Sequence, residues 1–227
     1  MRRTSMQLAA AMLAGGLAVA GCGTSLQLGA AATTSQGRIT SAELTNQDAN
    51  LTSAYATDKH KGATPQHPAA QVPQQVLTWL LTFRIWDRLA QQHGISVTQA
   101  QVQSEIKGLS ANATQQGVSV PVYVSAAGAV PPDLLQEIGR YAAISQAFEN
   151  RLDGGKLPSS QTAQTALAKR VAHAQCLAAK SLGIHVNPQY GEFDYGTFSV
   201  VPAPAKLSAA GGPAPKASSS PTLSPPC

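Results

Sequence analysis

The chain is poor in charge, in aromatic side chains and in cysteine. Charged residues make up 12% and aromatic residues 5% of its 227 residues, and there are three cysteines. Arg2, Arg3, Lys206 and Lys216 lie near the two ends, and without these four cations the formal net charge falls from +5 to +1. A body so close to neutral has no basic footprint for nucleic acid.

The sequence also lacks the motifs that carry most enzyme chemistry. It contains no G-x-S-x-G elbow, no P-loop, no G-x-G-x-x-G, no HExxH and no CxxC. Its five histidines are scattered, whereas a metal site needs three or four clustered ligands. Glu192 and Asp194 lie two residues apart after an Asn-Pro turn, so we interpret them as solvated turn residues rather than an acid–base pair. We therefore expect no catalytic residues, no metal site and no cofactor.

An apolar stretch near the N-terminus, Leu8–Ala20, follows the basic pair Arg2-Arg3 and leads to Cys22. This order is the layout of an export signal, and the stretch is shorter than the roughly 20 apolar residues that span a bilayer. The segment Val19–Cys22 resembles a bacterial lipobox, which implies cleavage before Cys22 and attachment of a diacylglyceryl group to its sulfur. An ordinary signal peptide with a chance cysteine is the alternative.

These features divide the chain into four parts. We expect residues 1–21 to be a lipoprotein signal peptide, 22–28 a short linker after the lipidated cysteine, and 29–201 a single domain. Residues 202–227 are almost all Pro, Ala, Ser, Gly and Lys. We expect this C-terminal tail to be disordered, because it cannot bury enough apolar surface to offset its ordering entropy. The mature protein is expected at the extracytoplasmic face of the cell membrane, held by its lipid anchor.

Two cysteines remain after lipidation, Cys176 and Cys227. In an oxidising compartment two such thiols are candidates for one disulfide, and a coil of about 26 residues spans roughly 28 Å, enough to reach the last helix. Helical spacing predicts an exposed face that carries Cys176 with Lys169, His173 and Lys180, a positive setting that favours the thiolate. A free Cys227 and an intermolecular bridge are the competing outcomes.

Hydrophobic periodicity and cap residues predict a mostly helical domain. The clearest helix runs from about Pro73 to His93 and is apolar around most of its girth, so we expect it to be central. Residues 118–124 alternate like a strand, but Ser119 and Pro121 also suit the start of a short helix. The other predicted elements are helices from the Thr40–Glu43 capping box to about Tyr55, from Ser96 or Thr98 across Leu109, from near Pro132 to Gly154-Gly155 and from about Ser160 to Leu182, and short strands at 184–186 and 197–201.

Three aromatic residues, Trp79, Phe83 and Trp86, form a stripe on the central helix. Large aromatic side chains at this spacing are usually buried in a core. The functional alternative is that part of the stripe lines a groove for unfolded apolar segments, since exposed apolar patches mark binding surfaces.

The order of these parts resembles the N-terminal chaperone domain of the SurA and PrsA type, as in actinobacterial SurA-like lipoproteins. The resemblance implies a single SurA N-terminal-like helical domain with a few short strands formed by the chain ends, and it favours a helix at 119–127. Thr33-Thr34-Ser35 departs from the usual apolar opening strand. The resemblance covers about Gly29 to Val201 and is carried by Ala30–Thr40, by Val76–Leu109 with its Gly94–Val97 hinge, by Gly117–Leu135 and by Gly183–Asp194.

In SurA-like chains a parvulin isomerase domain often lies between the long helix and the last helix. Here that connection is the six-residue turn Asp153–Pro158, far shorter than a domain, so we expect no isomerase activity. The resemblance implies a lipid-anchored, chaperone-like protein that binds unfolded or exported polypeptides. The alternative is a structural or adaptor lipoprotein that holds one specific cell-envelope partner.

Overall fold

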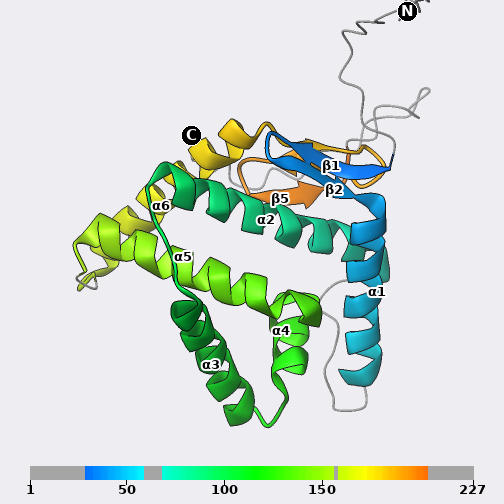
Figure 1. Ribbon diagram of the computed structural model, residues 1–227, viewed down its shortest axis with the longest axis horizontal. Coiled ribbons are helices and arrows are strands. Elements are labelled where there is room, and N and C mark those ends of the chain that lie inside the picture. The colour runs from blue at the N-terminus through cyan, green and yellow to red at the C-terminus, as the bar shows by residue number, and fades with distance from the viewer. Residues whose placement is uncertain (1–28, 59–67, 156–157, 204–227) are drawn as a thin grey trace, which may run out of the picture.

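The computed structural model describes residues 29–58, 68–155 and 158–203 (Figure 1). The predicted signal peptide and linker, with Cys22, and the tail from residue 204, with Cys227, lie outside the described residues. What the sequence predicts for those segments therefore stays a prediction.

Helices make up most of the described chain, as predicted, and short antiparallel strands make up its two sheets. The elements in chain order are β1 Ala30–Thr34, β2 Gly37–Thr40, α1 Ser41–Asp58, η2 Ala69–Gln71, α2 Val72–Gln92, α3 Gln99–Gln115, α4 Val120–Gly128, η3 Pro132–Leu134, α5 Leu135–Asp153, α6 Gln161–Leu182, β3 His185–Val186, β4 Glu192–Asp194 and β5 Ser199–Val201.

A three-stranded sheet joins the two ends of the described chain. Its order is β2-β1-β3, and Ala32 of β1 pairs with Ile39 on one side and with Val186 on the other. Ala30, Ala31 and Ala32 have 0% exposure. Their strand, β1, is the central one, with β2 on one side and β3 on the other. The prediction of short strands formed by the chain ends is confirmed.

The predicted central helix is α2. It contacts α1, α5, α6 and β5, and nine of its side chains between Val72 and Leu89 are buried. Pro73 lies in its first turn, where a missing N–H costs no hydrogen bond. The helix ends at Gln92, and Gly94 follows with a positive φ of 60°. Contacts with elements on several sides explain why apolar residues surround most of the circumference of α2.

The ambiguous segment at 118–124 is helical. It forms α4, whose N-cap is Ser119 and whose first turn contains Pro121. The Ser125 hydroxyl is buried and donates to the Pro121 carbonyl. Ser119 is the N-cap by position without a side-chain capping hydrogen bond, Pro121 fits the first turn, and the prediction of a helix at 119–127 is confirmed.

The α3–α5 crossing depends on a glycine. A Cβ atom at Gly139 would lie 2.8 Å from Ile106 Cγ1 and 3.0 Å from the Val102 carbonyl oxygen. Only a residue without a side chain lets the two backbones approach this closely. Thr98 caps α3 through a complete capping box with Gln101, which resolves the choice between Ser96 and Thr98.

The sequence patterns missed strand β2, because they place Gly37–Thr40 at the opening of the first helix, and strand β4, which forms a hairpin with β5. The Asp194 carboxylate closes the hairpin by accepting hydrogen bonds from the Gly196 N–H at 2.8 Å and the Thr197 hydroxyl at 2.7 Å. The Val200 N–H donates to the Thr78 hydroxyl at 2.9 Å, which docks the hairpin on α2. Glu192 and Asp194 thus belong to a strand, and the interpretation of both as solvated turn residues is wrong: Asp194 is the half-buried last residue of β4, and its carboxylate caps the turn that follows.

Among the helices that the structure describes, none combines the length and the apolar character that a bilayer crossing requires.

Candidate polypeptide-binding groove

The aromatic stripe of α2 lies in the core. Phe83 and Trp86 are 9% and 3% exposed, and the half-buried Trp79 donates its indole N–H to the Gly128 carbonyl at 2.9 Å. All three rings pack around Tyr141 of α5, with centroid distances of 5.4 to 6.4 Å. The structure therefore favours the core alternative, and Phe83 and Trp86 offer no surface to a peptide in this conformation.

Two polar atoms in this cluster are affected by burial. Burial raises the pKa of the Tyr141 phenol, and the negative charge of Glu149 raises it further. The Trp86 indole N–H has no hydrogen-bond partner within the described chain, and its ring meets Tyr141 edge-on at 5.4 Å. Tyr141 thus joins α5 to α2 mainly by ring packing.

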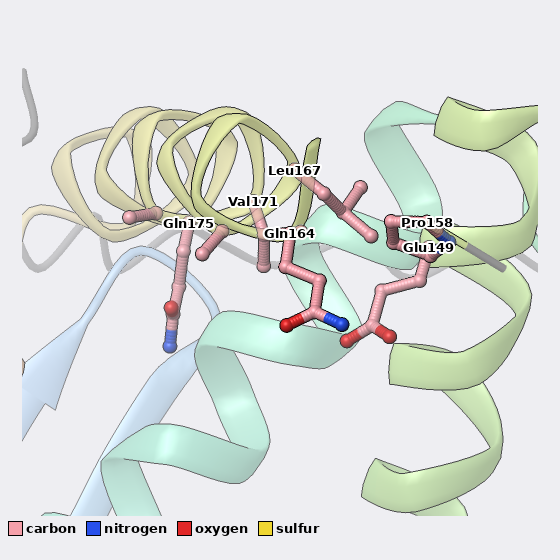
Figure 2. Close-up of a pocket in the computed structure, with 8 residues that line it drawn as sticks. Glu149, Pro158, Gln164, Leu167, Val171 and Gln175 are labelled. Carbon is pink, nitrogen blue, oxygen red and sulfur yellow. The ribbon is translucent and has the colours of Figure 1, made fainter. Parts of the chain in front are cut away.

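An open groove lies instead between α5 and the first half of α6 (Figure 2). Its volume is about 580 Å³. Most of its wall is apolar, and its polar groups are two amides and one carboxylate. The residues that line this α5–α6 groove are Glu149, Pro158, Gln164, Leu167, Ala168, Val171, Ala172 and Gln175.

The pattern of α6 explains why the groove is open. Leu167 and Val171 recur at four-residue spacing and are half-buried, whereas Ala168 beside them is exposed. The only exposed large apolar side chain in the described ranges, Leu177 at 49%, lies further along the same helix. Small alanines leave space that larger side chains would fill, so the apolar row stays partly accessible.

Polar side chains lie at the rim of the groove. Gln164 and Glu149 extend toward each other from α6 and α5 (Figure 2). The Ser145 hydroxyl donates to the Glu149 carboxylate at 3.2 Å, which orients that carboxylate. Ser145 lies one helical turn before Glu149 on α5, so this contact is made within the helix that forms one wall of the groove.

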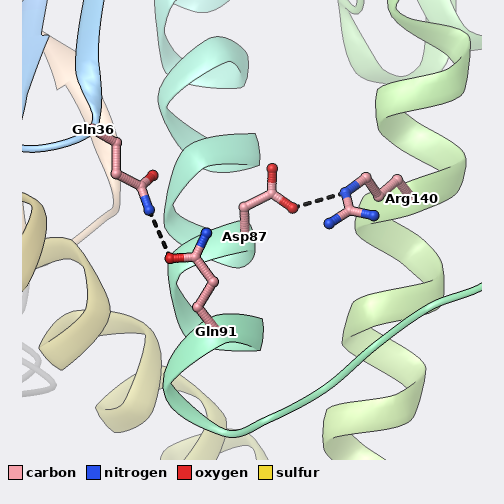
Figure 3. A network of polar contacts seen from close by, with 4 residues as sticks. All are labelled: Gln36, Asp87, Gln91 and Arg140. Carbon is pink, nitrogen blue, oxygen red and sulfur yellow. Dashed lines mark hydrogen bonds and ion pairs between the residues drawn. The ribbon is translucent and has the colours of Figure 1, made fainter.

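Three polar residues of α2, Asp87, Arg88 and Gln91, make contacts with neighbouring elements, including both helices of the groove. Asp87 accepts from Arg140 of α5 at 2.8 Å, and Gln91 accepts from Gln36 of the β1–β2 turn at 2.9 Å (Figure 3). Arg88 donates to Ser181 of α6 at 3.0 Å. These contacts are exposed and individually weak, but together they link α5, α6 and the β1–β2 turn to α2.

The prediction that Cys176 lies on an exposed face is wrong. Its side chain has 0% exposure, on a helix that packs against α2 and α5. Cys176 is also disulfide-bonded, so it is no thiolate in this form. The other two cysteines, Cys22 and Cys227, lie outside the described residues, and the pairing with Cys227 stays a prediction. Lys169, His173 and Lys180 are exposed, as expected.

The described residues contain no group of three or more His, Cys, Asp or Glu side chains placed to hold a metal ion. No protein-family model, no curated protein and no solved structure matches this chain. The likeness to SurA-type domains rests on the sequence order alone.

Proposed function

We propose that this chain is an extracytoplasmic, lipid-anchored protein that binds unfolded or exported polypeptides and has no isomerase activity. The observation that supports the proposal is the α5–α6 groove, an open and mostly apolar groove whose lining includes the amides of Gln164 and Gln175. The order of the predicted signal, lipobox and helical domain provides the location.

The dimensions of the groove suit a short extended segment. Gln164 and Gln175 are eleven residues apart on α6, a rise of about 16 Å, which equals about five residues of extended chain. Leu167 and Val171 between them supply the apolar contact. A glutamine amide carries both a donor and an acceptor, so Gln164 and Gln175 can each pair with a peptide backbone whatever its side chains are. This combination favours apolar segments without a strict sequence requirement.

The charge of the site also fits transient binding. Glu149 is the one charged residue of the groove wall, and the body as a whole is close to neutral. Binding therefore depends on apolar burial rather than on charge pairing, and burial of two half-exposed aliphatic side chains contributes only a few kcal/mol. Weak, reversible association is what a holding chaperone needs.

The test is suppression of aggregation of a denatured, cysteine-free client by the full mature chain, measured before and after reduction of its disulfide. We expect suppression at near-equal molar ratio in at least one of the two states. Leu167→Asp, which places a charge in the groove, should abolish it. Leu177→Asp is the matched control, because Leu177 is exposed on the same helix outside the groove. No suppression at several-fold excess in either state would overturn the proposal.

The adaptor alternative predicts a different result. Recovery of the chain from membranes in mild detergent would then yield one envelope protein in stoichiometric amount, unaffected by Leu167→Asp. Many unrelated polypeptides, lost in the Leu167→Asp variant, are expected for the chaperone.

A further inference from the structure

Cys176, which is disulfide-bonded, directly follows Gln175, the last residue of α6 that lines the groove. Ala168, Ala172 and Cys176 are spaced four residues apart on α6, so they form one row on the helix surface. Ala168, Ala172 and the preceding Gln175 line the groove. A segment bonded to Cys176 therefore begins one residue beyond the groove lining of α6.

The chain has two candidates for the other half of this bond, Cys22 and Cys227. The lipobox assigns the sulfur of Cys22 to a thioether, which removes it from disulfide chemistry. Cys227 is the last residue, 24 residues beyond Ala203, the last described residue. A chain of that length spans up to about 80 Å, more than the roughly 33 Å length of α6.

We propose that Cys176 is bonded to Cys227 and that the C-terminal segment 221–226 occupies the α5–α6 groove as a tethered competitor of clients. This inference rests on the proposed function, because it assigns the same groove. What it adds to the proposed function is the segment that occupies the groove and the disulfide that holds the segment there.

The register of the segment matches the groove. Pro221, Pro225 and Pro226 favour a polyproline II conformation, with a rise of about 3.1 Å per residue. Leu223 is four residues before Cys227, so it lies about 12 Å from the disulfide. Ala168 is eight residues before Cys176, a rise of about 12 Å along α6. Leu223 would therefore lie beside Ala168 and Leu167, where the groove wall is apolar.

The composition of the segment matches as well. Residues 221–226 are Pro-Thr-Leu-Ser-Pro-Pro, with no charge and one large aliphatic side chain. The tail has a second leucine, Leu207, but it lies 20 residues from Cys227, about 60 Å in the same conformation. Only Leu223 is in register with the groove.

The bond makes the competition dependent on redox state. Its formation joins the Cys176 and Cys227 sulfurs and removes two protons and two electrons, which pass to the disulfide of a thiol-exchange protein. Reduction by dithiothreitol reverses the step, giving two thiols and the cyclic disulfide of the reagent. A tethered segment acts at an effective concentration of about 1 mM; with a Kd of about 0.1 mM for the groove, a value typical of weak peptide binding, its release should tighten client binding about tenfold.

Two measurements test the inference on the full mature chain. The first is disulfide mapping by non-reducing mass spectrometry, which should identify a Cys176–Cys227 peptide pair. The second is methyl NMR, which should show contacts between the Leu223 methyl groups and those of Leu167 and Val171 that disappear on reduction. A Cys22–Cys176 pair, free thiols at both positions or the absence of these contacts would overturn the inference without any client.

Client affinity separates this inference from the proposed function. Cys227→Ser and Leu223→Asp should each tighten binding of a permanently unfolded, cysteine-free polypeptide about tenfold, and Leu207→Asp is the matched control that should leave it unchanged. Unchanged affinity in Cys227→Ser and Leu223→Asp, together with loss of binding in Leu167→Asp, would overturn the inference and leave the proposed function intact. Absence of client binding in every variant would overturn the proposed function.

Discussion

Replacement of Gly139 by alanine should destabilise the domain, although alanine is the better helix former. The change raises intrinsic helix propensity by about 1 kcal/mol. It also puts a Cβ atom 2.8 Å from Ile106 Cγ1, 3.0 Å from the Val102 carbonyl oxygen and 3.1 Å from Ile106 Cδ1. The backbone oxygen cannot move without displacing α3, and such overpacking costs about 1–3 kcal/mol. The expected net loss is about 1 kcal/mol.

Gly108 provides the matched control for this prediction. It lies inside α3, and a Cβ atom built on it meets nothing within 4 Å. Gly108→Ala should therefore gain about 0.5–1 kcal/mol from the same propensity term without any clash. The difference between the two variants, about 2 kcal/mol, isolates the contact at the crossing.

Thermal unfolding by circular dichroism is the assay. For a domain of this size about 2 kcal/mol corresponds to roughly 4–8 °C in Tm, so Gly108→Ala should melt above the parent chain and Gly139→Ala below it. If both variants melt at higher temperature by the same amount, the close approach of α3 and α5 does not limit stability and the reasoning is refuted. A double mutant with Ile106→Ala should show coupling, because it removes two of the three contacting atoms.

Three further predictions follow from other parts of the chain. Cys22→Ala should leave the precursor unacylated and shift the protein out of the membrane fraction, since a diacylglyceryl group supplies the two chains that stable attachment requires; an unchanged mass and membrane retention would refute lipidation. The pKa of Tyr141 is raised in the folded chain, so near pH 10 the unfolded chain releases the phenol proton while the folded chain retains it. The free energy of unfolding should therefore fall as the pH rises above about 10. Tyr141→Phe should weaken this fall, measured by urea unfolding at a series of pH values. Gly191→Ala should disrupt the β4–β5 hairpin, because φ is 125° there and the new Cβ would collide with the Val201 carbonyl; an unchanged amide spectrum of β5 would contradict it.

Helix positions were predictable from local chemistry. Thr98, Ser119 and Ser160 each precede a helix as its N-cap, and Gly154 and Gly183 follow α5 and α6 with positive φ. These signals act within four residues of a helix end, so a sequence pattern contains them completely. The predicted bounds of α2, α5 and α6 therefore agree with the structure within a few residues.

Strand β4 was not predictable on the same terms. Its three residues, Glu192–Asp194, are too few to show a period of two, and it exists because β5 pairs with it and docks on Thr78 of α2. Its signals are Gly191, with a positive φ of 125°, and Asp194, which caps the turn. Both residue types also occur in open loops, so only the tertiary contact distinguishes a hairpin.

The misplaced Cys176 shows why the groove could not be located from the helical pattern of α6. A helical wheel assumes that one face is covered along the whole helix. In α6 the coverage changes: Leu167 and Val171 of the first half are half-buried toward α5, whereas Cys176, Ala178 and Leu182 of the second half have 0% exposure. α2 packs against α6, and the Ser35 N–H of the β1–β2 turn donates to the Leu182 carbonyl at 2.7 Å at the end of the helix. The first half of α6 therefore lines the groove with Leu167 and Val171, whereas the second half is buried in the core. The groove lies along the half of the helix that is less covered.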